Sequence, residues 1–88
     1  MDIPYEKLPE RLRESMKHYI EEGAIPGDFL IAVICNNLVY ALSSADDEMI
    51  EKIEEIVFWA YNHIPSRAFG SHKKMIQWNQ ERGLKGLE

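Results

Sequence analysis

The stretch from Phe29 to Leu42 constrains the fold most, because it is apolar apart from Asn36 and Asn37. Its leucine, isoleucine and alanine side chains recur at spacings of three and four, which would cover one side of a helix. The strict period of two that marks a half-buried strand is lacking. We therefore predict a central, buried helix over residues 28–43.

A second interpretation of this stretch stays open. Asparagine tolerates positive φ, so Asn36-Asn37 could form a turn between two short strands. Residues 29–42 would then be a β-hairpin, and the fold would be α+β rather than all-α.

Capping signals predict three further helices. Proline suits the first position of a helix and glycine its end, so Pro9 and Gly23 bracket a helix that ends near residue 22. The serine-rich and acidic residues 43–48 are typical of a helix start, and this third helix should end near residue 62. Ser71 can cap a fourth helix over residues 72–82. The sequence thus predicts an all-α, bundle-like domain of about four helices.

The chain of 88 residues is short enough for a single domain, which we expect to span residues 1–86. The closing pair Leu87-Glu88 is typical of the junction left by a purification tag. A hydrophobic content of 45 % is ordinary for a globular protein, so we expect folding without metal, cofactor or disulfide. The single cysteine, Cys35, is predicted to be a buried, inert thiol.

The longest apolar run covers residues 29–35 and is far shorter than the roughly 20 residues that span a bilayer. The chain also does not begin with the charged and apolar segments of an export signal. We therefore expect a cytoplasmic protein without a membrane partner.

The charge is unevenly distributed along the chain. Residues 1–65 contain thirteen acidic and five basic side chains, whereas residues 66–88 contain two acidic and five basic ones, and the net charge is −5. The acidic part argues against wrapping on DNA. The basic end could still contact an anion, because local charge governs short-range contacts at physiological salt.

The basic end contains a candidate anion site. Free main-chain N–H groups at a helix start attract phosphate. Basic side chains lie beside the helix start predicted at residue 72. The candidate residues are Arg67, Gly70, Ser71, His72, Lys73 and Lys74. The alternative is an ordinary serine cap with surface lysines, since the longer glycine-rich loop of a P-loop is absent.

Two further sets of residues are candidates for contacts with other proteins. Phe58, Trp59 and Tyr61 make the end of the third helix apolar all round, and Phe69 follows on the next loop. If exposed they would form an anchor patch of the kind that interfaces favour, and the alternative is that other parts of the chain cover them. Asn36 and Tyr40, one turn apart on the predicted central helix, could belong to a recognition surface.

A set of scattered residues covering roughly residues 5–83 resembles a family of small, uncharacterised proteins encoded by tailed phages and prophages. The residues are Leu8-Pro9-Glu10, Tyr19-Ile20-Glu21, Gly23, Pro26-Gly27, Phe29-Leu30, Ala32-Val33, Asn36, Leu38, Ala45-Asp46, Tyr61-Asn62, Pro65, Gly70-Ser71 and Trp78. The resemblance implies an accessory role in the cytoplasm of an infected or lysogenic bacterium. It supplies no catalytic residue.

No enzyme motif is found in the sequence. It lacks a nucleophile beside a base, a carboxylate pair in an apolar setting and a nucleophile elbow, so we predict that the protein is not an enzyme. His18, His63 and His72 are far apart and lack the paired spacing of a zinc site, so no metal is expected.

Three functional hypotheses follow. The first is a non-catalytic accessory protein that binds a host or phage protein, as a monomer or a homodimer. The second is sequestration of a phosphate-bearing small ligand, such as a nucleotide, near residues 67–74. The third and weakest is nucleic-acid binding through the basic end.

Overall fold

A computed structural model describes residues 3–87, and every regular element in that range is helical. The α-helices are α1 (Glu10–Glu22), α2 (Asp28–Ile34), α3 (Leu38–Ser44), α4 (Asp47–Glu51), α5 (Ile53–His63) and α6 (His72–Gln80). Three 3-10 turns accompany them: η1 (Tyr5–Lys7), η2 (Ser66–Ala68) and η3 (Gly83–Leu87). The all-α prediction is confirmed for these residues, with six helices instead of about four. The β-hairpin over residues 29–42 is wrong.

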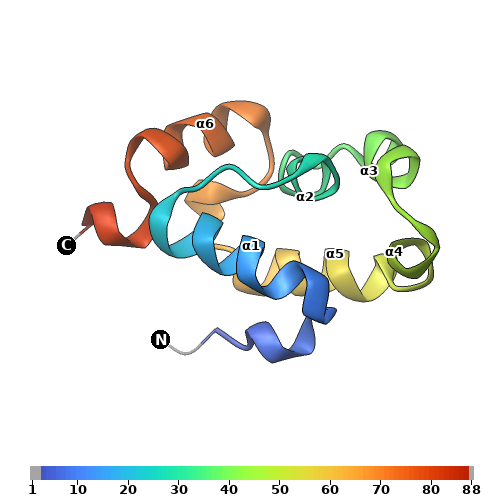
Figure 1. Ribbon diagram of the computed structural model, residues 1–88. Coiled ribbons are helices and arrows are strands. Elements are labelled where there is room, and N and C mark those ends of the chain that lie inside the picture. Colours follow the sequence, from blue (N-terminus) through green and yellow to red (C-terminus); the bar gives the residue numbers. More distant parts are fainter. Residues whose placement is uncertain (1–2, 88) are drawn as a thin grey trace.

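The molecule is elongated, with principal extents of 38 × 25 × 18 Å. Figure 1 shows α6 and α3 toward opposite ends, with α2 between them and α4 below α3. Residue 87 closes η3, whereas Glu88, the second residue of the predicted tag junction, lies outside the described residues.

The first helix ends where predicted and begins one residue later, because Pro9 was expected at its first position. Pro9 occupies the N-cap of α1, and Gly23 ends the helix in a left-handed conformation with φ 76°. Met16, Tyr19 and Ile20 are its buried residues, and they recur at the spacing of one helical face. Local capping chemistry was therefore sufficient to predict this element.

The predicted central helix over residues 28–43 is wrong in its continuity, because it breaks into α2 and α3 at the asparagine pair. Asn36 adopts φ 60°, and its N–H donates to the carbonyl of Val33 while that of Asn37 donates to the carbonyl of Ala32. This is a Schellman motif, which ends a helix with a left-handed residue. The Asn37 side chain then accepts from the N–H of Tyr40 and caps α3.

Because of the break, the glycine variant of Asn36 should be more stable than the alanine variant, which is the reverse of the order in a continuous helix. Asn36→Ala should lower the free energy of unfolding by about 1 to 2 kcal/mol, because alanine tolerates the left-handed conformation poorly. Asn36→Gly should be nearly neutral. Urea denaturation followed by circular dichroism measures both. A continuous helix would give the opposite order, with glycine about 1 kcal/mol worse than alanine.

The predicted third helix is also two helices. The side chain of Asp46, not a serine, caps α4 by accepting from the N–H of Met49. Lys52, at φ −107°, separates α4 from α5. The predicted fourth helix is confirmed as α6, which Ser71 caps through the N–H of Lys74, although it ends two residues earlier than expected.

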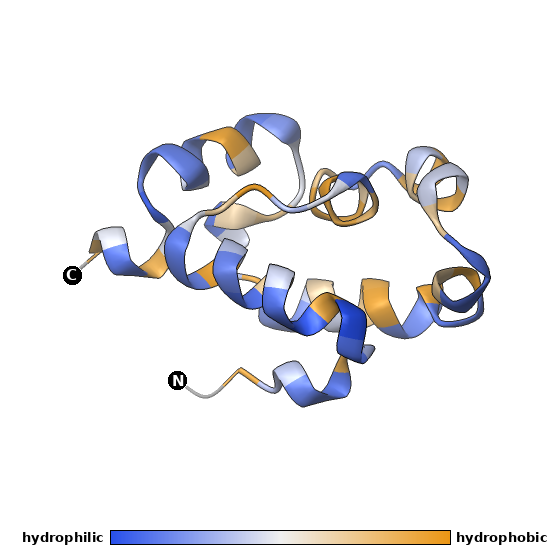
Figure 2. Cartoon of the chain, viewed as in Figure 1, coloured by the Kyte–Doolittle hydropathy of each residue, from blue (hydrophilic) through white to orange (hydrophobic). Residues whose placement is uncertain are grey.

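The core receives side chains from every α-helix. Its fully buried members include Leu8, Met16, Tyr19, Ile20, Leu30, Ile34, Ala41, Met49, Ile56, Trp59, Ala60, Met75 and Trp78. Figure 2 shows α2 almost wholly in the hydrophobic colour, whereas most of α1 is hydrophilic. Cys35 is half-buried beside Met75, and burial raises the pKa of its thiol.

Main-chain carbonyls accept hydrogen bonds from the polar groups of buried aromatic side chains. The Trp78 indole N–H donates to the carbonyl of Tyr19 at 2.9 Å, and the Tyr19 hydroxyl donates to the carbonyl of Ala68 at 2.6 Å. These bonds join α1 to α6 and η2, which lie 59 and 49 residues away in the sequence. None of the helices in residues 3–87 has the length and apolar content needed to cross a bilayer.

Candidate functional site

The aromatic end of α5 is divided between core and surface. Trp59 is buried, stacks near Tyr5 and donates its indole N–H to the carbonyl of Pro4 at 2.9 Å. Phe58 and Tyr61 remain 65 % and 68 % exposed. Phe69 is half-buried against the core. The four predicted contact residues therefore do not form one continuous patch, because Trp59 is turned into the core, while Phe58 and Tyr61 are widely exposed.

Helix α3 is the second large source of exposed apolar surface. Only Ala41 of its seven residues is buried, while Leu38 is 57 % and Val39 77 % exposed. Tyr40 and Leu42 are exposed as well. A helix this short cannot bury apolar residues on all its sides against one neighbour. Contiguous exposed apolar surface of this kind marks interaction sites in soluble proteins.

A small apolar pocket joins α3 to α5. It holds about 110 Å³ and is lined by Ala32, Val33, Asn36, Asn37, Leu38, Ala41, Val57 and Phe69. Leu42 lies one turn from Leu38, and Tyr61 lies one turn from Val57. We call the surface made by Leu38, Leu42, Val57, Phe58 and Tyr61 the α3–α5 face.

Sequence reasoning missed most of this face. Leu38 and Leu42 were expected on the buried side of the predicted helix over residues 28–43. Val57 was expected on the inner side of the predicted third helix. The asparagine pair, taken as a helix break, was the signal that could have found them. Of the two predicted recognition residues, Asn36 lines the pocket and Tyr40 is exposed on α3, with the break between them.

An acidic segment precedes Val57, Phe58 and Tyr61 of the α3–α5 face along the chain. Residues 46–55 contain six acids and one lysine, and the structure pairs Asp46 and Glu48 with Arg11. The other four acids are exposed and make no ion pair within residues 3–87; they are Asp47, Glu51, Glu54 and Glu55. Glu54 lies one turn before Phe58 and on the same side of α5. Glu54 therefore places a carboxylate without an ion pair beside the aromatic residues, whereas Glu55 lines a different groove together with Glu6 and Arg13.

The candidate anion site has already used much of its hydrogen-bonding capacity. The Gly70 N–H donates to the carbonyl of Ile34 at 2.8 Å, and Lys74 Nζ donates to the carbonyl of Ser66 at 3.3 Å. Arg67 pairs with Glu81 at 3.2 Å. His72 and Lys73 are exposed at the start of α6. The six residues are thus close in the sequence, but those of their polar groups that are engaged have separate partners and do not converge on one point.

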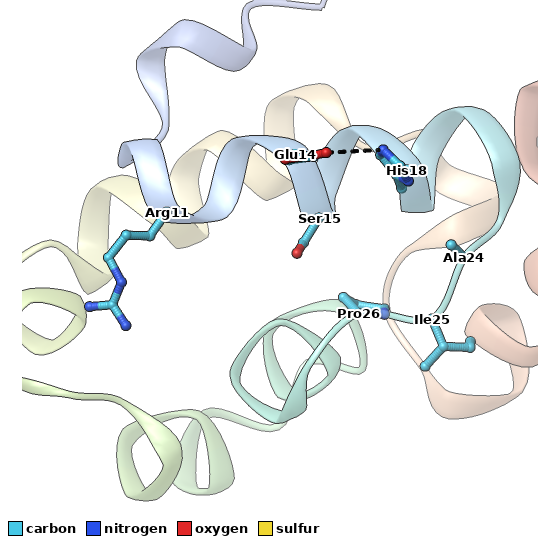
Figure 3. Close-up of a pocket in the computed structure, with 7 residues that line it drawn as sticks. All are labelled: Arg11, Glu14, Ser15, His18, Ala24, Ile25 and Pro26. Carbon is cyan, nitrogen blue, oxygen red and sulfur yellow. Dashed lines mark ion pairs between the residues drawn. The ribbon is translucent and has the colours of Figure 1, made fainter.

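A second concave region is an open groove of about 380 Å³ beside α1 (Figure 3). Arg11, Glu14, Ser15 and His18 supply its polar wall, and residues 24–26 supply its apolar wall. His18 lies 3.8 Å from Glu14 and 3.5 Å from Glu22, and Arg11 bonds Asp46. The N–H of Met49 and the Arg11 guanidinium lower the pKa of the Asp46 carboxyl. Arg11 and the His18 imidazole therefore already have carboxylate partners.

The predicted separation of the three histidines agrees with the structure. His18 is on α1, His63 ends α5 beside Trp59, and His72 begins α6. Within residues 3–87, histidine, cysteine and carboxylate side chains form no group of three that could hold a metal ion.

Comparison with known proteins adds no relative from which to transfer a function. No family model matches the chain, and neither a curated protein nor a solved structure matches it. The phage-family resemblance therefore rests on the residues quoted for it in the sequence.

Proposed function

We propose that this protein is a non-catalytic binding protein that uses the α3–α5 face to hold a segment of another protein. The observation that carries the proposal is the exposure of large apolar side chains on two adjacent elements around one small pocket. An exposed patch of this kind is costly in water and is typical of an interaction surface. A host or phage protein is the partner that the family resemblance implies.

The exposed aromatic residues suit such a role. Against a partner, Tyr61 and Phe58 would bury much apolar area with few rotatable bonds, and hot spots of protein interfaces are enriched in aromatic side chains. The pocket between Leu38 and Val57 could receive one anchoring side chain from the partner.

The phosphate-ligand and nucleic-acid hypotheses have less support. Arg67 and Lys85, two of the five bases in residues 66–88, pair with Glu81 and Glu22. The Gly70 N–H is also engaged with α2. An anion would have to compete with these internal partners.

Removing apolar side chains from the face should weaken the binding of selected peptides. Displayed random peptides would be selected for binding to the wild-type protein and then measured against Leu38→Ser combined with Tyr61→Ser. We expect an affinity loss of at least about tenfold, because truncating central apolar anchors of an interface has effects of this size. Fluorescence anisotropy gives the dissociation constants.

The matched control combines Ile25→Ser with Ile76→Ser. These side chains are 42 % and 37 % exposed and lie outside the face, so the same chemical change should leave affinity nearly unaltered. Circular dichroism verifies that both double variants are folded. Failure to enrich any peptide, or an equal loss in the two variants, would count against the proposed function.

A further inference from the structure

We infer that the segment held by the α3–α5 face is a basic amphipathic helix. This inference rests on the proposed function and adds the chemistry of the partner. Two features of the face carry it: the spacing of its apolar side chains and the acidic side chains beside them.

The shape of the face favours a helix over other peptide conformations. Strand addition requires an exposed sheet edge, and residues 3–87 contain no strand. The apolar side chains instead stand in two rows, Leu38 with Leu42 on α3 and Val57 with Tyr61 on α5. Each row has the i,i+4 spacing of about 5 to 6 Å that matches the ridges of another helix.

The charge of the face favours a basic partner. Glu54 is exposed on the side of α5 that presents Phe58 and Tyr61, and no ion pair within residues 3–87 neutralises it. Residues 29–45, which include all of α3, have no charged side chain, so nothing on that side offsets the acids of residues 46–55. Complementary potentials raise association rates and select between partners.

A second copy of this chain fits the same charge pattern poorly. Two copies packed through this face would bring Glu54 and its acidic neighbours together, and like charges at an interface oppose association. Each copy also has a net charge of −5. The lysine-bearing helix of a different protein meets no such repulsion.

Two synthetic peptides test the inference directly. Both are amphipathic helices of roughly 18 residues with the same leucine stripe, one with lysine and the other with glutamate on its polar face. We expect the lysine peptide to bind at least about tenfold more tightly by fluorescence anisotropy, and its affinity should fall as NaCl rises from about 0.05 to about 0.5 M.

Adjacent glutamates provide the matched variants. Glu54→Lys should weaken the lysine peptide about fivefold, because it replaces an attraction beside Phe58 by a repulsion. Glu55→Lys makes the same change in net charge on the next residue, which points to another side of α5, and should change affinity less than twofold. Leu38→Ser should weaken both peptides.

Four results would overturn the inference. Equal binding of the two peptides, or equal effects of Glu54→Lys and Glu55→Lys, would leave an apolar site without charge selection. Absence of lysine-peptide binding, when random peptides are still selected against the face, would reject this partner and keep the proposed function. A wild-type dimer by light scattering that becomes monomeric with Leu38→Ser would assign the face to a second copy.

Discussion

Replacing Trp78 by alanine should remove most of the stability of this protein. The side chain is 1 % exposed, and its indole N–H is bonded to the carbonyl of Tyr19. Truncating a buried tryptophan costs about 3 to 5 kcal/mol, whereas a chain of this length has a total of about 4 to 13 kcal/mol. We therefore expect Trp78→Ala to be largely unfolded or to melt far below the wild type.

Thermal and urea denaturation followed by circular dichroism measure this loss. Ile76→Ala, two residues away on the exposed side of α6, is the control and should change stability by less than about 1 kcal/mol. Trp78→Phe should fall between them, because it keeps much of the ring volume but removes the indole N–H bond to the Tyr19 carbonyl, which still accepts from the N–H of Gly23. A small effect of Trp78→Ala would mean that α6 contributes little to the core.

Replacing Gly83 by alanine should cost about 2 to 4 kcal/mol, from left-handed strain and overpacking together. Gly83 adopts φ 62°, and an added Cβ would lie 2.6 Å from the N of Gly23 and 2.8 Å from the carbonyl O of Ile20. These are main-chain atoms at the end of α1, which cannot move aside as a flexible side chain would. The end of the described chain would have to separate from α1.

Gly27→Ala is the matched control for this second experiment. Gly27 has φ −73°, and nothing lies within 4 Å of a Cβ added there. Alanine should therefore change stability by less than about 1 kcal/mol, because its restriction of the unfolded chain is offset by its weaker suitability for the N-cap of α2. Urea denaturation compares the two variants. Equal effects at both positions would contradict the close approach of Gly23 and Gly83.

Both stability variants act away from the α3–α5 face. Trp78 and Gly83 join α6 and η3 to α1, whereas the face is formed by α3 and α5. A loss of peptide binding in these variants should consequently follow the fraction of unfolded protein. The variants of Leu38, Tyr61 and Glu54 should alter binding while the protein stays folded.

Helix ends were the most predictable part of the fold. Gly23, Ser71 and the acidic start at residue 46 act through bonds to groups within a few residues, so their effect can be read from a short window of sequence. The asparagine pair contained the same kind of local information. Its tolerance of positive φ was noted for a hairpin, and it ends a helix instead.

The candidate sites depended on groups distant in the sequence. Phe58, Trp59 and Tyr61 are neighbours along α5, yet a turn of about 100° per residue sends Trp59 toward the N-terminal segment and leaves the other two exposed. The partners of the basic end were equally unpredictable from the sequence. Gly70 bonds to Ile34 and Lys85 pairs with Glu22 only in the folded chain. No window of sequence contains those pairs.

By itself the sequence determined that the chain is helical and where several of its helices begin and end, because capping and periodicity are local properties of the backbone. Only the tertiary structure decided which apolar side chains are left uncovered, that Leu38 and Val57 share a pocket, and which charged groups already have partners. Those properties depend on how helices distant in the sequence pack, and packing is governed by contacts summed over the whole core.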